Sequence, residues 1–268
     1  MRIPSCWRPR TTELHRFIPA RGTVTHTVTW IAALCSAFIS TVTHAAAVLP
    51  KPFVATYAVS FRGIDGGRLI MEWRQDTQAG RFVFETRANP SALASFFVSG
   101  NAFERTTLEA TDDGLRPLLW VADDGKSGNK GDGKLEFNWT DHVVSGSYEG
   151  KPVTLPLEPG MMDRLSVQVG VMAALLQGHA PGTIAMVNGD SIRHYTYTAG
   201  KTESVSSKLG TFEAVTYEST RPNSNRVSRM WHAPALEYIP VRAEQIRKGK
   251  VETVMELIEL KTVDRAAE

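Results

Sequence analysis

Short runs of alternating apolar and polar residues recur along most of the chain after residue 52, and Gly and Asp residues separate them. Alternation with period two between turn residues is typical of antiparallel strands that bury one face. The runs lie at 53–59, 69–73, 82–86, 103–108, 118–122, 135–139, 143–148, 184–187, 192–197, 212–217, 227–231, 238–246 and 251–260. A sheet of more than about ten strands does not stay flat and open. We therefore predict a mainly β fold, an antiparallel meander curled into a half-barrel or open barrel.

Two segments break the alternation and predict helices. The segment 161–177 has apolar residues at intervals of three and four, and its remaining faces are apolar as well. A helix without a polar face has to be buried, so we place it on the concave side of the curved sheet. The segment 91–97 follows Asn89-Pro90 and predicts a short helix with Phe96 and Phe97 on one side.

Residues 1–47 have the order of a secretory signal peptide: a region with five arginines, an apolar run at 28–39, and small residues before residue 48. A membrane span needs roughly 20 apolar residues, and this run is shorter. The sequence predicts cleavage after Ala45 or Ala47, a periplasmic location, and no transmembrane span in the mature chain. The length of the basic region leaves an uncleaved anchor as the alternative. Residues 48–268 fit one β-rich domain.

The charge of the mature chain gives no sign of nucleic-acid binding. The whole sequence has 30 Lys and Arg against 28 Asp and Glu, and without the five Arg and one Glu of residues 1–47 it has 25 against 27. A nucleic-acid surface requires clustered basic residues. Both cysteines, Cys6 and Cys35, lie in the predicted signal peptide. The mature chain therefore has no thiol for a disulfide or a thiolate metal site.

No short motif in the sequence has the residues and spacing that a catalytic or metal centre requires. The segment 128–134 matches the start of a phosphate-binding loop, but Leu135 replaces the Ser or Thr and a strand follows instead of a helix. Gly189-Asp190-Ser191 lies between two predicted strands, where it is an ordinary turn. The four histidines of the mature chain are not spaced to share a metal ion. We predict no catalytic residue, no metal site and no cofactor.

Charged residues in two apolar segments predict a structural ion pair. Glu104 and Arg105 lie within a predicted strand, and Asp163 and Arg164 lie at the start of the predicted helix. A lone buried charge is costly, so such residues usually pair. We expect Glu104 or Arg105 to contact Asp163 or Arg164 and to fix the helix to the sheet.

Seven short motifs occur in order and together resemble a known family. They are Pro52-Phe53-x-Ala55-Thr56-Tyr57, Gly66-Gly67, Phe103-Glu104-Arg105, Asp163-Arg164-Leu165-Ser166-x-Gln168, Leu209-Gly210-Thr211-Phe212, Trp231-His232-Ala233-Pro234 and Ile239-Pro240-Val241. The sequence resembles the bacterial exported family called domain of unknown function 3108 (DUF3108), over about 52–260. The resemblance implies a periplasmic, predominantly β protein, and it provides no catalytic residues to transfer. The architecture is also similar to that of half-barrel lipoprotein carriers.

Three hypotheses for the function follow. The first is a non-enzymatic envelope protein that binds or carries a lipid or another hydrophobic ligand in the concave face of the sheet. The candidate ligand-binding residues are Trp73, Phe96, Phe97, Trp120, Met161 and Met162. The second is a structural or assembly factor that binds another envelope protein through a sheet edge or an apolar patch. The third is an envelope hydrolase, which would need a polar cluster inside a pocket.

Overall fold

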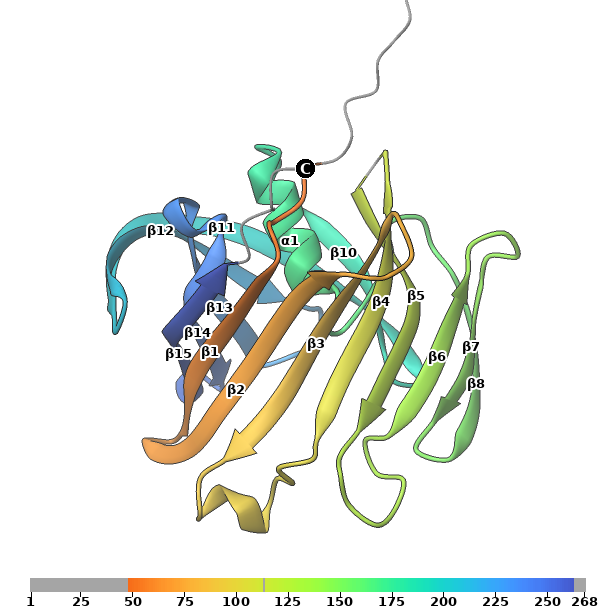
Figure 1. The fold of residues 1–268 in the computed structure, drawn as a ribbon, viewed down its shortest axis with the longest axis horizontal. Helices are drawn as coiled ribbons and strands as arrows, with labels where there is room; N and C mark the ends of the chain where they lie inside the picture. The colour runs from red at the N-terminus through yellow and green to blue at the C-terminus, as the bar shows by residue number, and fades with distance from the viewer. Residues whose placement is uncertain (1–47, 113, 263–268) are drawn as a thin grey trace, which may run out of the picture. The chain divides into compact units, whose positions relative to one another are not determined.

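The described part of the chain is one large curved sheet with a helix inside its curve. The computed structural model describes residues 48–112 and 114–262 (Figure 1). The predicted signal peptide, 1–47, lies outside these residues. All 15 strands belong to the same sheet, and the sheet does not close into a barrel. The predicted mainly β, half-open architecture is therefore confirmed.

The elements follow one another as a meander. In chain order they are β1 (Phe53–Phe61), β2 (Ile64–Gln75), β3 (Arg81–Pro90), the 3-10 helix η1 (Ala94–Phe96), β4 (Phe103–Thr111), β5 (Gly114–Asp123), β6 (Gly133–Asn138), β7 (Val143–Tyr148), β8 (Lys151–Pro156), β9 (Met162–Asp163), α1 (Val167–Leu176), β10 (Thr183–Asn188), β11 (Ser191–Ser207), β12 (Gly210–Thr220), β13 (Arg226–Ala233), the 3-10 helix η2 (Pro234–Leu236), β14 (Ile239–Arg247) and β15 (Lys250–Thr262).

The first and last strands meet in the middle of the sheet. The spatial order is β8-β7-β6-β5-β4-β3-β2-β1-β15-β14-β13-β12-β11-β10-β9. Phe53 at the start of β1 pairs with Thr262 at the end of β15. Neighbouring strands are antiparallel except β9 and β10, which are parallel. The two outer strands, β8 and β9, are consecutive in the chain, and β9 also lies against β5.

One row of side chains across six strands forms the centre of the core. The strand registers align Phe53, Trp73, Phe84, Thr106, Trp120 and Leu135, one from each of β1 to β6. All six are almost completely buried. Large apolar residues at the same position of successive strands fill the concave face, because side chains at paired positions point to the same side of a sheet. Thr106 is the single polar member of this row.

The predicted buried helix is confirmed, but its predicted bounds of 161–177 are wrong. The helix α1 begins at Val167, and it ends at Leu176 before Gly178, which has a φ of 75°. Residues Met162–Asp163 form the strand β9 instead. Asp163 Oδ1 accepts the backbone N–H groups of Leu165 at 2.8 Å and of Ser166 at 2.9 Å. These two bonds form a turn before the helix and delay its start.

The segment predicted to be a short helix at 91–97 contains only the 3-10 turn Ala94–Phe96. The loop that carries this turn projects from the edge of the sheet (Figure 1). The prediction of a short helix is therefore correct in place, but the helix is one 3-10 turn of three residues. Among the described residues, no helix has the length and apolar character needed to cross a membrane.

Candidate functional site

The concave side of the sheet holds a cavity of about 510 Å³. Its walls come from both halves of the sheet and from the segment that leads into α1. The lining includes apolar, aromatic and polar side chains, among them Tyr57, Leu69, Met71, Glu104, Arg164, Met186, Tyr197, Ser219, Arg221, Ser224, Arg226, Ser228, Met230, Ala243, Gln245 and Met255. A cavity lined by both apolar and polar side chains suits an amphipathic molecule.

Four methionines contribute to the apolar lining of this cavity: Met71, Met186, Met230 and Met255. The register places Ala243 between Met230 and Met255, and this small residue helps to leave space at the centre of the wall. Methionine side chains are unbranched and flexible, so they fit apolar groups of different shape.

Two tyrosines add buried phenols to the same wall. Tyr57 Oη donates to the carbonyl oxygen of Pro240 at 2.9 Å. Burial raises the pKa of Tyr57 and of Tyr197 above the ordinary value. Both side chains are therefore neutral near pH 7, and they contribute apolar surface with a polar end rather than a charge.

Part of the polar lining of the cavity comes from the turn between β12 and β13. Arg221, Ser224 and Arg226 come from this turn and its two ends. Within residues 48–112 and 114–262, neither arginine is within 4.0 Å of a carboxylate. Arg226 is exposed, so the cavity reaches solvent at this turn, where the two guanidinium groups can meet an anionic group.

An ion pair between Glu104 and Arg164 closes one wall of the cavity. Arg164 Nε donates to Glu104 Oε1 at 2.7 Å, and Trp120 Nε1 donates to the same oxygen at 2.6 Å. The Arg164 guanidinium also lies 4.9 Å from the centre of the Trp120 ring. This arrangement ties the segment before α1 to β4 and β5, which is the contact that the sequence suggested between these two segments.

Asp163 lies under this ion pair and is 1% exposed. Its Oδ1 accepts the Thr106 hydroxyl at 2.9 Å as well as the two backbone N–H groups described above, while its Oδ2 is buried without a hydrogen-bond partner. Burial raises the pKa of Asp163 from 3.8 to about 6, although the hydrogen bonds from Ser166 and Leu165 oppose this change. Asp163 therefore acts as a buried anchor for the turn before α1.

Replacing Glu104 with Ala is expected to lower the free energy of unfolding by about 2 kcal/mol, because Arg164 and Trp120 both lose their acceptor. Glu104→Ala, Arg164→Ala and the double variant form a double-mutant cycle. We expect a coupling energy of about 1 kcal/mol in urea unfolding. Additive losses would mean that the ion pair does not hold the helix segment to the sheet.

Arg105, the other charged residue of β4, pairs away from the helix. Its guanidinium binds Glu85 on β3, and Arg87 binds the second oxygen of the same carboxylate. Burial opposes the charge on Glu85, but the hydrogen bonds from Arg105 and Arg87 outweigh it and lower the pKa of this carboxyl. This cluster of Glu85, Arg87 and Arg105 joins β3 to β4, and none of the three residues lines the cavity described above.

The six side chains suggested from sequence as ligand-binding residues do not line this cavity. Trp73, Trp120, Met161 and Met162 are buried in the filled core. Phe96 and Phe97 are 80% and 79% exposed on the loop that contains η1. Glu104 and Arg164, which the sequence predicts as ion-pair residues, do line the space, but the other lining residues were not identified from the sequence, because they are scattered over many strands.

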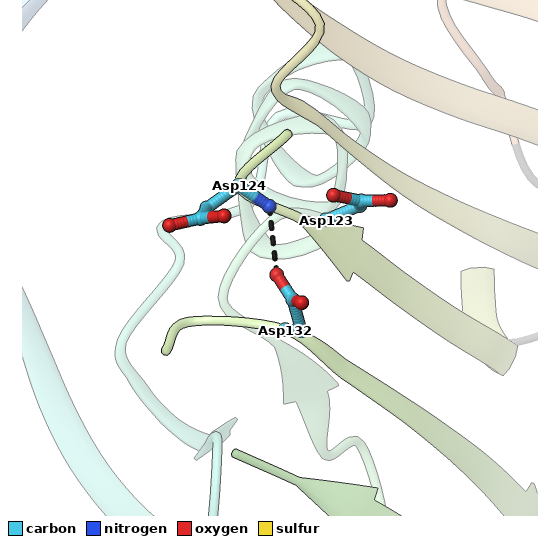
Figure 2. Close-up of side chains that lie close together, drawn as sticks. All are labelled: Asp123, Asp124 and Asp132. Carbon is cyan, nitrogen blue, oxygen red and sulfur yellow. Dashed lines mark hydrogen bonds between the residues drawn. The ribbon is translucent and has the colours of Figure 1, made fainter. Parts of the chain in front are cut away.

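Three carboxylates gather in the loop between β5 and β6, as Figure 2 shows. Oxygens of Asp123, Asp124 and Asp132 lie within 4.8 Å of one another. Each carboxylate accepts a backbone N–H of the same loop: Asp123 from Gly125, Asp124 from Lys126, and Asp132 from Asp124. Turn formation accounts for their position.

Three solved structures are similar to this chain. The first is a beta-barrel-like protein of the domain of unknown function DUF1849 from Brucella abortus, with a TM-score of 0.48, 15% identity, and coverage of 81% of this chain and 100% of that one. The second, from Bacteroides fragilis, is named as an exported protein with a YmcC-like fold. Its TM-score is 0.32 and its identity is 14%, and the match covers 81% of this chain and 100% of that one. The third, from Parabacteroides distasonis, is named as a lipoprotein. Its TM-score is 0.36 and its identity is 13%, and the match covers 80% of this chain and 97% of that one.

None of the curated proteins matches the chain in sequence. A family profile does match, over residues 56–256, which is most of the described sheet from β1 to β15. The match also contains the cavity residues of both halves of the sheet and the whole of α1. The chain therefore belongs to the family of proteins of unknown function DUF3108.

Proposed function

We propose that this protein is a non-catalytic periplasmic protein that binds or carries a lipid or another hydrophobic ligand in the concave cavity. The observation that carries the proposal is the cavity of about 510 Å³ with its four methionines. Sites for small molecules commonly enclose about 300–1,000 Å³ and are largely apolar, with a few polar groups that orient the ligand. The order of basic, apolar and small residues in 1–47 supports export.

The lining of the cavity supports binding rather than catalysis. Among the described residues that line it, Glu104 is the one carboxylate, and there is no histidine. Arg164 and Trp120 already engage one oxygen of this carboxylate. A hydrolase needs a general base or an activated nucleophile within reach of its substrate. The serines of the lining, Ser219, Ser224 and Ser228, have no such partner in the lining.

Replacing Ala243 with Phe is expected to weaken binding of an apolar fluorescent probe, 1-N-phenylnaphthylamine, by about tenfold or more. The new ring would occupy the space between Met230 and Met255 on the cavity wall. Fluorescence titration measures the change. Ser145→Phe on β7 is the matched control, because Ser145 is exposed and does not line the cavity.

Equal probe affinities for the wild-type protein and Ala243→Phe would contradict the assignment of the cavity as the binding site. Native mass spectrometry of protein purified from its own envelope gives an independent measurement. We expect an added mass that lipid extraction removes. A protein that carries no added mass and binds no apolar probe would end the carrier proposal.

A further inference from the structure

One loop of the protein presents large apolar side chains directly to solvent. The loop 91–102 connects β3 to β4, and it contains no charged residue. Leu93, Phe96 and Phe97 on this loop are 66%, 80% and 79% exposed. Exposed apolar groups that gather in one place usually mark a surface that contacts another apolar phase.

Several turns lie beside this loop at the same end of the sheet, and together they form a loop rim. We define the loop rim as the β1–β2 turn at 62–63, the loop 91–102, the β12–β13 turn at 221–225 and the β14–β15 turn at 248–249. Figure 1 shows the β1–β2 turn and the η1 loop at the lower edge of the sheet. The exposed side chains of Phe61, Ile64 and Val251 extend the apolar surface along this rim.

Hydrogen bonds connect the members of the loop rim. Ser91 Oγ donates to the carbonyl oxygen of Asp65 at 2.8 Å, which joins the η1 loop to the β1–β2 hairpin. Arg62 N donates to the carbonyl oxygen of Glu252 at 2.7 Å, and Lys248 N donates to that of Asn225 at 2.9 Å. The rim is therefore a continuous surface from the apolar loop to the β12–β13 turn.

The part of the rim beyond the apolar loop is basic. Arg221, Arg226, Arg247, Lys248 and Lys250 occupy the segments 221–226 and 247–250, and these two segments contain no acidic residue. The hydrogen bond from Arg62, together with the charges of Arg247 and Arg226, lowers the pKa of the neighbouring Glu252. The segment 123–134, which connects β5 to β6, has three Asp and three Lys, so its formal charges balance. The rim thus combines an uncharged apolar tip with a cationic segment.

The cavity reaches solvent at the same rim, because the lining residue Arg226 is exposed. Arg221, Ser224 and Arg226 line the cavity and also form the β12–β13 turn and its ends. A molecule that leaves the cavity at this turn would pass the surface that carries the exposed phenylalanines and the arginines.

We propose that the loop rim docks onto the surface of an anionic phospholipid bilayer, with Phe96 and Phe97 inserted among the lipids and the cavity opening facing the membrane. Aromatic side chains prefer the boundary between headgroups and acyl chains. Lys and Arg next to such an insertion are attracted to anionic headgroups. A protein interface fits the rim less well, because charged residues are depleted in the cores of such interfaces. The docking does not require that the cavity holds a ligand.

Cosedimentation with vesicles tests the docking, with protein expressed from the full-length sequence. We expect the wild-type protein to bind vesicles of phosphatidylglycerol and phosphatidylethanolamine, and to bind phosphatidylcholine vesicles more weakly. The double variant Phe96→Ser/Phe97→Ser should lose binding to the anionic vesicles by about tenfold or more. Leu209→Ser is the matched control, because Leu209 is an exposed apolar residue in the β11–β12 turn, outside the rim. Thermal unfolding should show that all variants are equally folded.

A second double variant tests the contribution of the basic residues separately from that of the phenylalanines. Lys248→Glu/Lys250→Glu should weaken binding to anionic vesicles and leave binding to phosphatidylcholine unchanged, and added salt should reduce the difference. Ala243→Phe should bind vesicles like the wild type, so a failure of the cavity assignment is distinguishable from a failure of docking. Two results would overturn the proposal: no wild-type binding to anionic vesicles, or equal binding by the phenylalanine variant. Crosslinking from position 96 to a protein, without vesicle binding, would identify a protein partner instead.

Discussion

Replacing Trp73 with Ala is expected to lower the free energy of unfolding by about 3–5 kcal/mol. The Trp73 side chain is completely buried, it stacks on Phe82 with ring centres 4.9 Å apart, and it meets the edge of Phe84. Its Nε1 donates to the carbonyl oxygen of Pro50 at 2.9 Å, which fixes the chain before β1. The substitution removes this packing and leaves a cavity in the central row. Urea unfolding followed by circular dichroism measures the loss.

Trp139→Ala is the matched control for this measurement. Trp139 Nε1 also donates to a proline carbonyl oxygen, that of Pro117 at 2.8 Å, but the side chain is only half-buried. We expect a smaller loss of stability for Trp139→Ala, since less apolar surface returns to water on unfolding. Equal losses for the two variants would show that the central row is not the main source of stability.

Asp163→Asn is expected to remove a pH dependence of about 3 kcal/mol from the stability of the fold. The pKa of Asp163 rises from 3.8 to about 6 on burial, so the folded protein binds this proton more tightly than the unfolded chain does. The contribution of Asp163 to stability is therefore greatest below pH 3.8, and it falls as the pH rises toward 6. Above that pH, the charged carboxylate opposes folding.

The difference in unfolding free energy, Asp163→Asn minus wild type, should increase by about 2 kcal/mol between pH 4 and pH 7, because part of the full effect already falls below pH 4. Urea unfolding at several pH values measures it. Thr106→Val is the control, because it removes a hydrogen bond to Asp163 but keeps the carboxyl group. This variant should keep the fall in stability toward pH 7. A constant difference for Asp163→Asn would mean that the carboxyl titrates alike in the folded and unfolded chains.

The strands could be predicted where alternation and turn residues agree, and two strands were missed for identifiable reasons. Strand β8 contains Pro152 and Pro156, which argue against a strand inside a sheet. It forms because it is an outer strand, where one side needs no backbone partner. For strand β9 the sequence predicts helix, because Met162 and Leu165 have helical spacing. Its two residues pair with β10, a contact that the local sequence does not encode.

The polar cluster around Glu104 was easier to predict than the cavity. Charges inside apolar segments need partners, and this physical requirement limits the choices even without coordinates. The cavity follows instead from what the strands leave unfilled. Trp73 fills one part of the concave face, while Ala243 between two methionines leaves another part open. The sequence shows which side chains point inward, but the remaining volume depends on the curvature of the whole sheet.

The direction of the η1 loop could not be predicted from its pattern. Phe96 and Phe97 lie on one side of a short segment, as in a helix that packs on a core. The segment forms a single 3-10 turn within the loop that joins two neighbouring strands. Both rings therefore extend away from the core. The sequence contains one sign that this loop is unusual: residues 91–102 include no charged residue, although most exposed loops do.

The pairing of β1 with β15 has a consequence for the order in which the chain acquires structure. During synthesis β1 emerges first among the strands, and one of its backbone edges has no partner until β15 is present. An unpaired strand edge readily joins other chains, and contacts between distant parts of a sequence form slowly. The two halves of the sheet can each build up from local hairpins, but they can be joined only after β15 has been synthesised. The sheet as a whole therefore cannot form before β15 is present, and until then the unpaired edge of β1 is exposed to aggregation.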